Sequence, residues 1–150
     1  MGALRGERTV EIQAPLVRCY AIAADIDRAP SWQAALQDVD VLERDGEGRA
    51  ASVDAEFDAR VRTIRARLRF SYREHERIDW RQERGDVKAL NGWWRFEELG
   101  ERLIRATYGL EVDPGMMLGM LLRGGMEDRV RDFLLGGAAE GLKERAEGTN

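Results

Sequence analysis

The sequence predicts an α+β fold of about seven strands, in which one strand and two short helices precede a six-stranded antiparallel meander and a long C-terminal helix. From Val39 to Val112, apolar and polar residues alternate with a period of two, which is typical of strands with one buried face. After Pro114 the period becomes helical. With 150 residues, 43% of them apolar and 35% charged, the chain fits one domain with a packed core, residues 1–150.

The N-terminal part of the chain predicts a strand followed by two helices. Val10 and Ile12 form the apolar face of a strand over Thr9 to Gln13. Pro15 then suits the first turn of a helix. The apolar side of that helix consists of Cys19, Tyr20, Ile22, Ala23 and Ile26. A second short helix is predicted around Ser31 to Leu36.

The meander shows clear turns and one apolar face. Turn residues lie at Asp45 to Gly48, Arg84 to Asp86 and Gly100-Glu101. Alternation places one set of side chains on a common inner wall: Val53, Phe57, Leu68, Phe70, Tyr72, Trp80, Gln82, Trp94, Phe96, Tyr108 and Leu110. The arginines of the strand over Ile64 to Arg73 fall on the opposite, solvated face.

After Pro114-Gly115 a long C-terminal helix is predicted that ends at about Ala146, with about 28 residues and a length of about 42 Å. One stripe of this helix faces the sheet and contains Leu122, Met126, Val130, Phe133, Gly137 and Gly141. Glycines on such a stripe permit close approach of another backbone. The Gly136-Gly137 pair is the predicted kink.

Three segments of the chain resemble the START-like (SRPBCC) superfamily of helix-grip proteins. They are Val10 to Pro15, Asp25 to Trp32 and Val39 to Gly46. The superfamily includes polyketide cyclase/dehydrases and coenzyme Q-binding proteins. The resemblance implies a curved sheet that wraps around the C-terminal helix, with an apolar cavity between them that holds a lipid, polyketide, quinone or similar molecule.

A ligand in that cavity would contact the inner wall and the helix above it. The predicted ligand-binding residues are Phe57, Leu68, Phe70, Tyr72, Trp80, Gln82, Trp94, Phe96, Tyr108, Met126, Val130 and Phe133. Their few polar atoms in an apolar shell are typical of a small-molecule pocket. The alternative is that these side chains fill one another's space and form ordinary core.

A catalytic function would make the protein a polyketide aromatase/cyclase. The cyclases of the superfamily resemble this chain around Ser71 to Arg73, which makes Arg73 the one catalytic candidate. Alternation, however, places Arg73 on the outer face of its strand. Ala29 and Leu36 also stand where aromatic residues of those cyclases are expected. We therefore favour binding without catalysis.

Composition argues against several other functions. His75 is the only histidine and Cys19 the only cysteine, so we expect no metal site, and no glycine loop for a nucleotide is present, so we expect no cofactor. The net charge of −4, with acidic residues beside the arginine row, argues against nucleic acid. Uncharged runs reach only nine residues, so we expect no transmembrane segment and a cytoplasmic location.

The sequence therefore predicts a carrier or sensor for a hydrophobic small molecule. Entry of that molecule would require movement of the C-terminal helix or of the loop near Pro114 to Gly119. A second hypothesis is the cyclase. A third is a protein-interaction module without a large cavity, which would use an edge strand or an exposed Trp93 and Leu135. A homodimer is left open.

Overall fold

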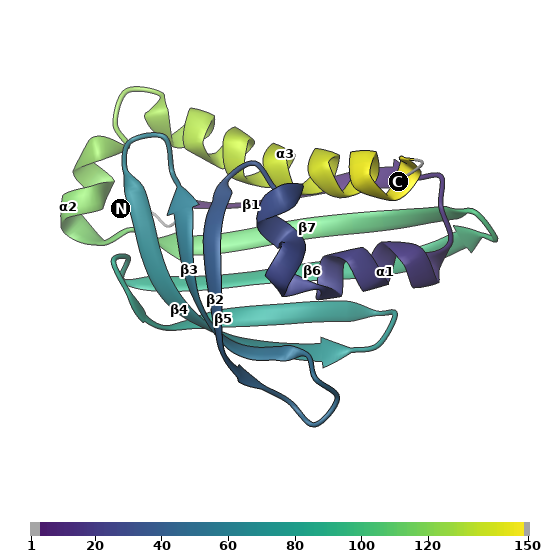
Figure 1. Ribbon diagram of the computed structural model, residues 1–150. Helices are drawn as coiled ribbons and strands as arrows, with labels where there is room; N and C mark the ends of the chain where they lie inside the picture. The colour runs from purple at the N-terminus through teal and green to yellow at the C-terminus, as the bar shows by residue number, and fades with distance from the viewer. Residues whose placement is uncertain (1–3, 149–150) are drawn as a thin grey trace.

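The computed structural model describes residues 4–148 and contains one antiparallel seven-stranded sheet, with the strand order β1-β7-β6-β5-β4-β3-β2 (Figure 1). The strands are β1 (Leu4–Ile12), β2 (Leu36–Arg44), β3 (Ala50–Asp58), β4 (Thr63–Arg73), β5 (Arg77–Gly85), β6 (Ala89–Gly100) and β7 (Leu103–Asp113). The helices are α1 (Leu16–Ala24), the 3-10 helix η1 (Ile26–Ser31), α2 (Gly115–Leu121) and α3 (Met126–Glu147). The six consecutive strands β2 to β7 form the predicted meander.

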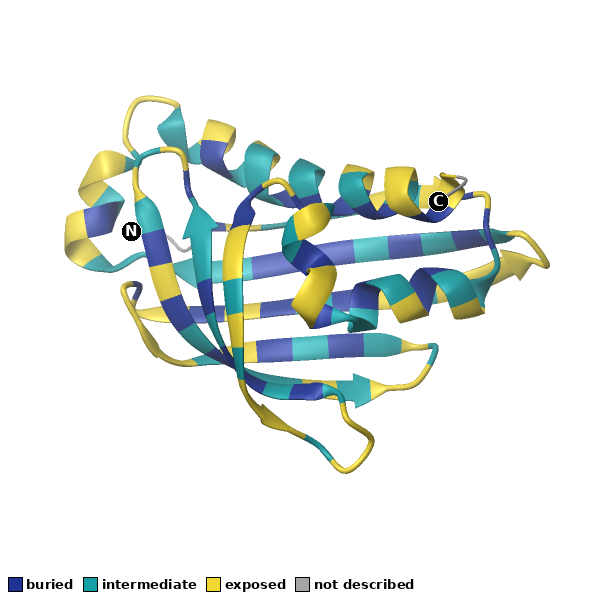
Figure 2. Cartoon of the chain, viewed as in Figure 1, coloured by how far each residue is buried: buried dark blue, intermediate teal, exposed yellow. Residues whose placement is uncertain are grey.

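The sheet curves around α3, and α1 and η1 lie on the same side of it as α3 (Figure 1). The strands alternate between buried and exposed residues, and the buried face of α3 is turned toward the sheet (Figure 2). Ile12, Ile78, Ile104 and Leu142 are fully buried in this layer. Each such side chain contributes about 1.5–3 kcal/mol through its removal from water. The predicted helix-grip architecture is confirmed.

Glycines pair with tryptophans on both faces of the sheet. Trp80 lies opposite Gly92 on the buried face, and a Cβ atom at Gly92 would overlap its indole ring. Trp93 lies opposite Gly109 on the outer face, and a Cβ atom at Gly109 would overlap that ring. The two glycines let large rings lie flat on the strands, because a glycine carries no side chain at the point of contact.

The second helix lies earlier than predicted. It is the 3-10 helix Ile26–Ser31, whereas a helix was expected around Ser31 to Leu36. Leu36 instead begins β2 and pairs with Phe57. The Asp58 backbone N–H also donates to the Ala35 carbonyl at 2.7 Å. Pairing with β3 therefore draws this segment into the sheet.

The C-terminal region forms two helices, so the prediction of one continuous helix is wrong. The break lies at Gly124 and Gly125, whose φ angles of 66° and 90° are in the left-handed region that favours glycine. The helix α3 continues through Gly136-Gly137, so the interruption of the C-terminal helix lies at the first glycine pair and not at the second.

The buried stripe of α3 differs in part from the predicted one. It contains Val130, Leu135, Ala138, Leu142 and Ala146. Leu135 was expected to be exposed, but it is 3% exposed. It lies over Gly6 of β1, where a Cβ atom would be 2.9 Å from a Leu135 methyl group. The missing side chain at Gly6 provides the space that Leu135 fills.

The arginines of β4 form cross-strand ion pairs on the outer face, as predicted. Arg67 Nε lies 2.8 Å from Asp54 Oδ1, and Arg69 Nε lies 3.0 Å from Glu83 Oε2. The hydrogen bond from Arg67 lowers the pKa of Asp54. These pairs neutralise much of the arginine row.

Among the described residues, no helix combines the length and the apolarity that crossing a membrane requires.

Candidate functional site

The first pocket lies between the sheet and the helices α2 and α3. Its volume is about 60 Å³. The end of β3 and the loop after it contribute Phe57, Ala59 and Val61, and β7 contributes Tyr108, Leu110 and Val112. The helices and their connections contribute Gln33, Pro114, Leu118, Leu122, Val130 and Leu134. Nearly all of this lining is apolar.

A second pocket of about 30 Å³ lies beside the first, under α1 and η1. Aromatic rings of the sheet form one side of it: Phe57, Phe70, Trp80, Trp94 and Tyr108. Small and aliphatic residues such as Ala23, Ile26 and Ala29 form the other. Gln33, Phe57 and Tyr108 line both pockets, so these three side chains stand between them.

Seven of the predicted ligand-binding residues line one or both pockets: Phe57, Leu68, Phe70, Trp80, Trp94, Tyr108 and Val130. Their rings also pack on one another. The ring centroids of Trp94 and Tyr108 are 4.8 Å apart, and those of Trp80 and Tyr108 are 5.6 Å apart. The interior is thus mostly filled by its own aromatic side chains, with the two pockets left between them.

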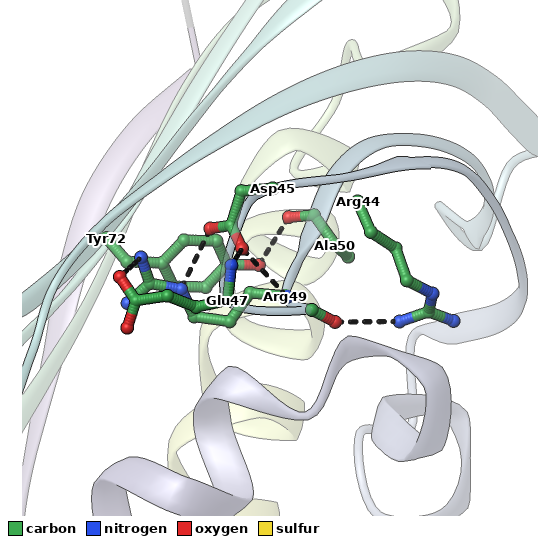
Figure 3. Close-up of polar contacts among 7 residues, drawn as sticks. Arg44, Asp45, Glu47, Arg49, Ala50 and Tyr72 are labelled. Carbon is green, nitrogen blue, oxygen red and sulfur yellow. Dashed lines mark hydrogen bonds and ion pairs between the residues drawn. The ribbon is translucent and has the colours of Figure 1, made fainter.

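Tyr72 of β4 lies outside both pockets and packs against the turn between β2 and β3. Its hydroxyl donates to the Ala50 carbonyl at 2.6 Å, and the guanidinium carbon of Arg49 lies 4.7 Å from the centre of its ring (Figure 3). Asp45 and Glu47 in turn hold Arg49, at 2.8 and 3.1 Å (Figure 3). Burial raises the pKa of Tyr72. Its one donor is therefore used within the protein.

Gln82 and Phe96 also lie outside both pockets. The Gln82 side-chain amide donates to the Val87 carbonyl at 2.9 Å, which fixes the turn between β5 and β6. Phe96 stacks on Trp94 with ring centroids 5.9 Å apart, and the Tyr20 ring packs against it nearly at right angles. Both side chains therefore support the walls without lining the pockets.

Met126, Phe133 and Arg73 complete the set of predicted site residues. Met126 begins α3 and is half-buried, and Phe133 lies under the guanidinium of Arg60, 3.7 Å from the ring centre. Arg73 is 69% exposed on the outer face and lies 3.8 Å from Glu76. Thus Arg73 faces away from the pockets, as alternation predicts.

Gln33 is a lining residue that the sequence did not indicate. Its side chain is 7% exposed, and its amide Nε2 lies 3.4 Å from the Tyr108 hydroxyl, which is 2% exposed. Burial raises the pKa of Tyr108, so the phenol stays protonated. The available signal was one amide in the otherwise apolar run Trp32 to Leu36, within a segment that was expected to be helical.

The first pocket is closed by α2 and by the loop between β3 and β4. Leu118 of α2 lines the pocket, whereas Met116 on the same short helix is 85% exposed. In the loop, Arg60 has a φ of 68°, a conformation that L-residues rarely adopt, and its N–H donates to the Asp58 carboxylate at 2.7 Å. We call the contact of Arg60 with Phe133 the latch, because it joins this loop to α3.

Cys19 and His75 lie away from the pocket linings. Cys19 is fully buried in α1, and burial raises the pKa of its thiol to about 11. His75 lies in the turn between β4 and β5 with a φ of 64°. Its ring packs nearly at right angles to that of Tyr20, with ring centroids 5.4 Å apart. These are packing positions.

Comparison with solved structures places the fold among START proteins. A START superfamily protein from Mycobacterium smegmatis matches with a TM-score of 0.83 and 20% identity, over 97% of this chain and 98% of that one. The Zhui aromatase/cyclase from a Streptomyces species matches with a TM-score of 0.70 and 20% identity, over 97% and 94%. At these identities the similarity concerns the fold alone.

The chain was also compared with family models and with curated proteins. No match was found among curated protein sequences. One family model, described as polyketide cyclase / dehydrase and lipid transport, matches residues 12–135 and so spans most of the sheet and the start of α3. The chain is therefore a member of the polyketide cyclase/dehydrase and lipid transport family, with a START-like helix-grip fold.

Proposed function

We propose that this protein binds a hydrophobic small molecule between the sheet and α3, as a carrier or sensor. The observation that carries the proposal is the pair of adjacent pockets, which share Gln33, Phe57 and Tyr108 and are otherwise lined by apolar side chains. Such a lining binds by burial, which contributes about 25 cal/mol for each Å² of apolar surface removed from water. A few polar groups then set the orientation of the ligand.

The pocket volumes indicate a closed state. Pockets that bury a ligand typically have about 300–1,000 Å³, whereas these two measure about 60 and 30 Å³. A ligand must therefore push side chains apart. Phe57 separates the two pockets and is only half-buried, which makes it the simplest side chain to move. Its displacement would join the two pockets into one cavity.

Ligand uptake is proposed to occur beneath α2. This helix has seven residues and presents Met116, Met117 and Met120 to solvent, so little apolar packing holds it against the domain. The left-handed Gly124 and Gly125 separate it from α3. The latch then holds the other side of the entrance, because it joins the β3–β4 loop to α3.

Arg60→Gln should accelerate both uptake and release of an apolar ligand by about two- to fivefold, because a partly exposed cation–π contact contributes about 0.5–1 kcal/mol. Stopped-flow fluorescence with N-phenyl-1-naphthylamine measures both rates. Arg62→Gln is the matched control, since Arg62 is exposed in the same loop. Equal rates in the two variants would contradict a gating function of the latch.

The cyclase function receives less support from the pocket linings. Among the described residues, Tyr108 is the one side chain of either lining that titrates as an acid or base, and burial raises its pKa. A proton-transfer catalyst works best with a pKa near the operating pH. Arg73, the catalytic candidate from the sequence, lies on the outer face. Binding therefore remains the better-supported proposal.

Filling the first pocket tests the binding function. Val130→Phe places a larger side chain where α3 lines that pocket, and we expect about a tenfold or greater loss of affinity for N-phenyl-1-naphthylamine in fluorescence titrations. Val17→Phe is the control, because Val17 is exposed on α1. Circular dichroism and urea unfolding establish that both variants fold. If folded Val130→Phe binds the probe with unchanged affinity, the probe does not bind in the first pocket.

A further inference from the structure

We propose that Gln33 and Tyr108 form a buried hydrogen-bond donor site that selects apolar ligands carrying an acceptor oxygen, such as a carbonyl, near the middle of the molecule. This inference rests on the proposed binding function and defines its ligand class. Both residues line both pockets, so a ligand that occupies the two pockets must pass their polar atoms. The rest of its length would meet hydrocarbon.

The hydrogen bond between the two side chains does not use all of their donors. The Gln33 amide donates to the Tyr108 hydroxyl at 3.4 Å, so the phenol oxygen accepts, and among the described residues its own proton has no acceptor. With the amide turned over, the phenol would donate to Gln33 and the NH₂ group would be left free. In either orientation a donor remains, and the raised pKa of Tyr108 keeps the phenol protonated.

Among the described residues, the buried Tyr20 hydroxyl and Trp32 indole nitrogen also have no partner, but neither residue lines either of the two pockets. Tyr72 donates to the Ala50 carbonyl, and the Gln82 amide donates to the Val87 carbonyl. An unused buried donor is costly, because it has lost its hydrogen bonds to water without replacing them. A ligand oxygen at this point would replace them, whereas a methylene group there would not. The free energy of binding should therefore depend on whether the ligand places an oxygen or a methylene group beside Gln33 and Tyr108.

The donor site is held in place by its surroundings. The Tyr108 ring lies against Trp94 and Trp80, with ring centroids 4.8 and 5.6 Å away. Gln33 follows Trp32, whose carbonyl group packs directly against Gly141 of α3. The pair is consequently positioned by the sheet on one side and by α3 on the other. A fixed donor discriminates between ligands better than a mobile one.

The test compares 9-fluorenone with fluorene, two rigid molecules of nearly the same shape that differ in a carbonyl and a methylene group. We expect the wild-type protein to bind fluorenone about tenfold or more tightly, which corresponds to about 1.4 kcal/mol. In Gln33→Leu/Tyr108→Phe the ratio should fall to about one while fluorene still binds, since replacing both partners with apolar groups is nearly neutral. The carbonyl stretching band of fluorenone bound to the wild-type protein should also shift to lower wavenumber.

Each outcome separates the two proposals. If both compounds bind the wild-type protein equally and the carbonyl band does not shift, the donor site is overturned and the binding function stands. A preference for fluorenone that persists in the double variant would also overturn the donor site. If neither compound binds and N-phenyl-1-naphthylamine gives no signal, the binding function fails, and the donor site fails with it.

Discussion

Gly141→Ala is expected to lower the free energy of unfolding by about 2 kcal/mol. A Cβ atom at Gly141 would overlap the backbone carbonyl oxygen of Trp32, so α3 or the segment after η1 has to shift. Overpacking of this kind costs about 1–3 kcal/mol, and here the neighbour is backbone, which yields less readily than the end of a side chain. For a chain of this size the melting temperature should fall by about 4–8 °C.

The matched control is Gly136→Ala in the same helix. There the nearest atom to a Cβ would be an Arg8 guanidinium nitrogen at 3.4 Å, at the end of a flexible side chain. Alanine should then stabilise the helix by up to about 1 kcal/mol relative to glycine. Urea unfolding of both variants separates the two effects. If both stabilise the protein alike, the close approach at Gly141 is absent.

Trp94→Ala should have the largest effect of the variants considered, about 3–5 kcal/mol. Its indole is buried against the rings of Tyr108, Phe96 and Trp32, with centroids 4.8, 5.9 and 6.3 Å away. Removing it deletes a second-pocket wall and leaves a cavity. Because the variant enlarges the pocket, it should be destabilised while still binding an apolar probe if it folds.

Trp93→Ala serves as the control for Trp94→Ala. The two residues are adjacent on β6 and face opposite sides of the sheet. Trp93 covers Gly109 on the outer face, and its indole N–H donates to Glu7 at 2.8 Å. Its loss should cost about 1–2 kcal/mol. A loss as large as that of Trp94→Ala, measured by chemical denaturation, would contradict the inward and outward assignment of this strand.

Much of the sheet was predictable because its period-two pattern is strong. Leu68, Trp80, Trp94 and Tyr108 were assigned to the inner face from alternation alone, and the structure places all four there. The same pattern placed acidic residues beside the arginine row, and the pair of Asp54 and Arg67 is one result. Alternation identifies the face of a side chain. It does not reveal which inward side chains border an open space.

The errors concern features that tertiary contacts decide. The sequence contains two glycine pairs in its C-terminal part, and only the structure shows that Gly124 and Gly125 adopt the left-handed conformation that ends a helix. Likewise, Leu135 was expected to be exposed. The space that buries it is provided by Gly6, more than a hundred residues away in β1, and the helix sequence alone does not reveal it. Gln33 was not predicted as a lining residue because its segment was expected to be helical, whereas it leads into β2, which pairs with β3.

Tyr72 illustrates why polar inward residues were harder to interpret than apolar ones. It belongs to the predicted inner wall, and a hydrogen bond to a ligand was a reasonable expectation from its position. The turn between β2 and β3 folds over it, however, and supplies both the Ala50 carbonyl and the Arg49 guanidinium (Figure 3). Partners from such a turn are not visible in the periodicity of β4.

The four tryptophans allow a direct test of where an apolar ligand binds. Trp80 and Trp94 line the second pocket, whereas Trp93 lies on the outer face. The measurement is a titration of ¹⁵N-labelled protein with 9-fluorenone, followed through the indole N–H resonances in ¹H–¹⁵N correlation spectra. Binding between the sheet and α3 predicts that the Trp80 and Trp94 resonances shift and saturate together while that of Trp93 stays in place. A shift confined to Trp93, or no shift at any indole, would contradict it.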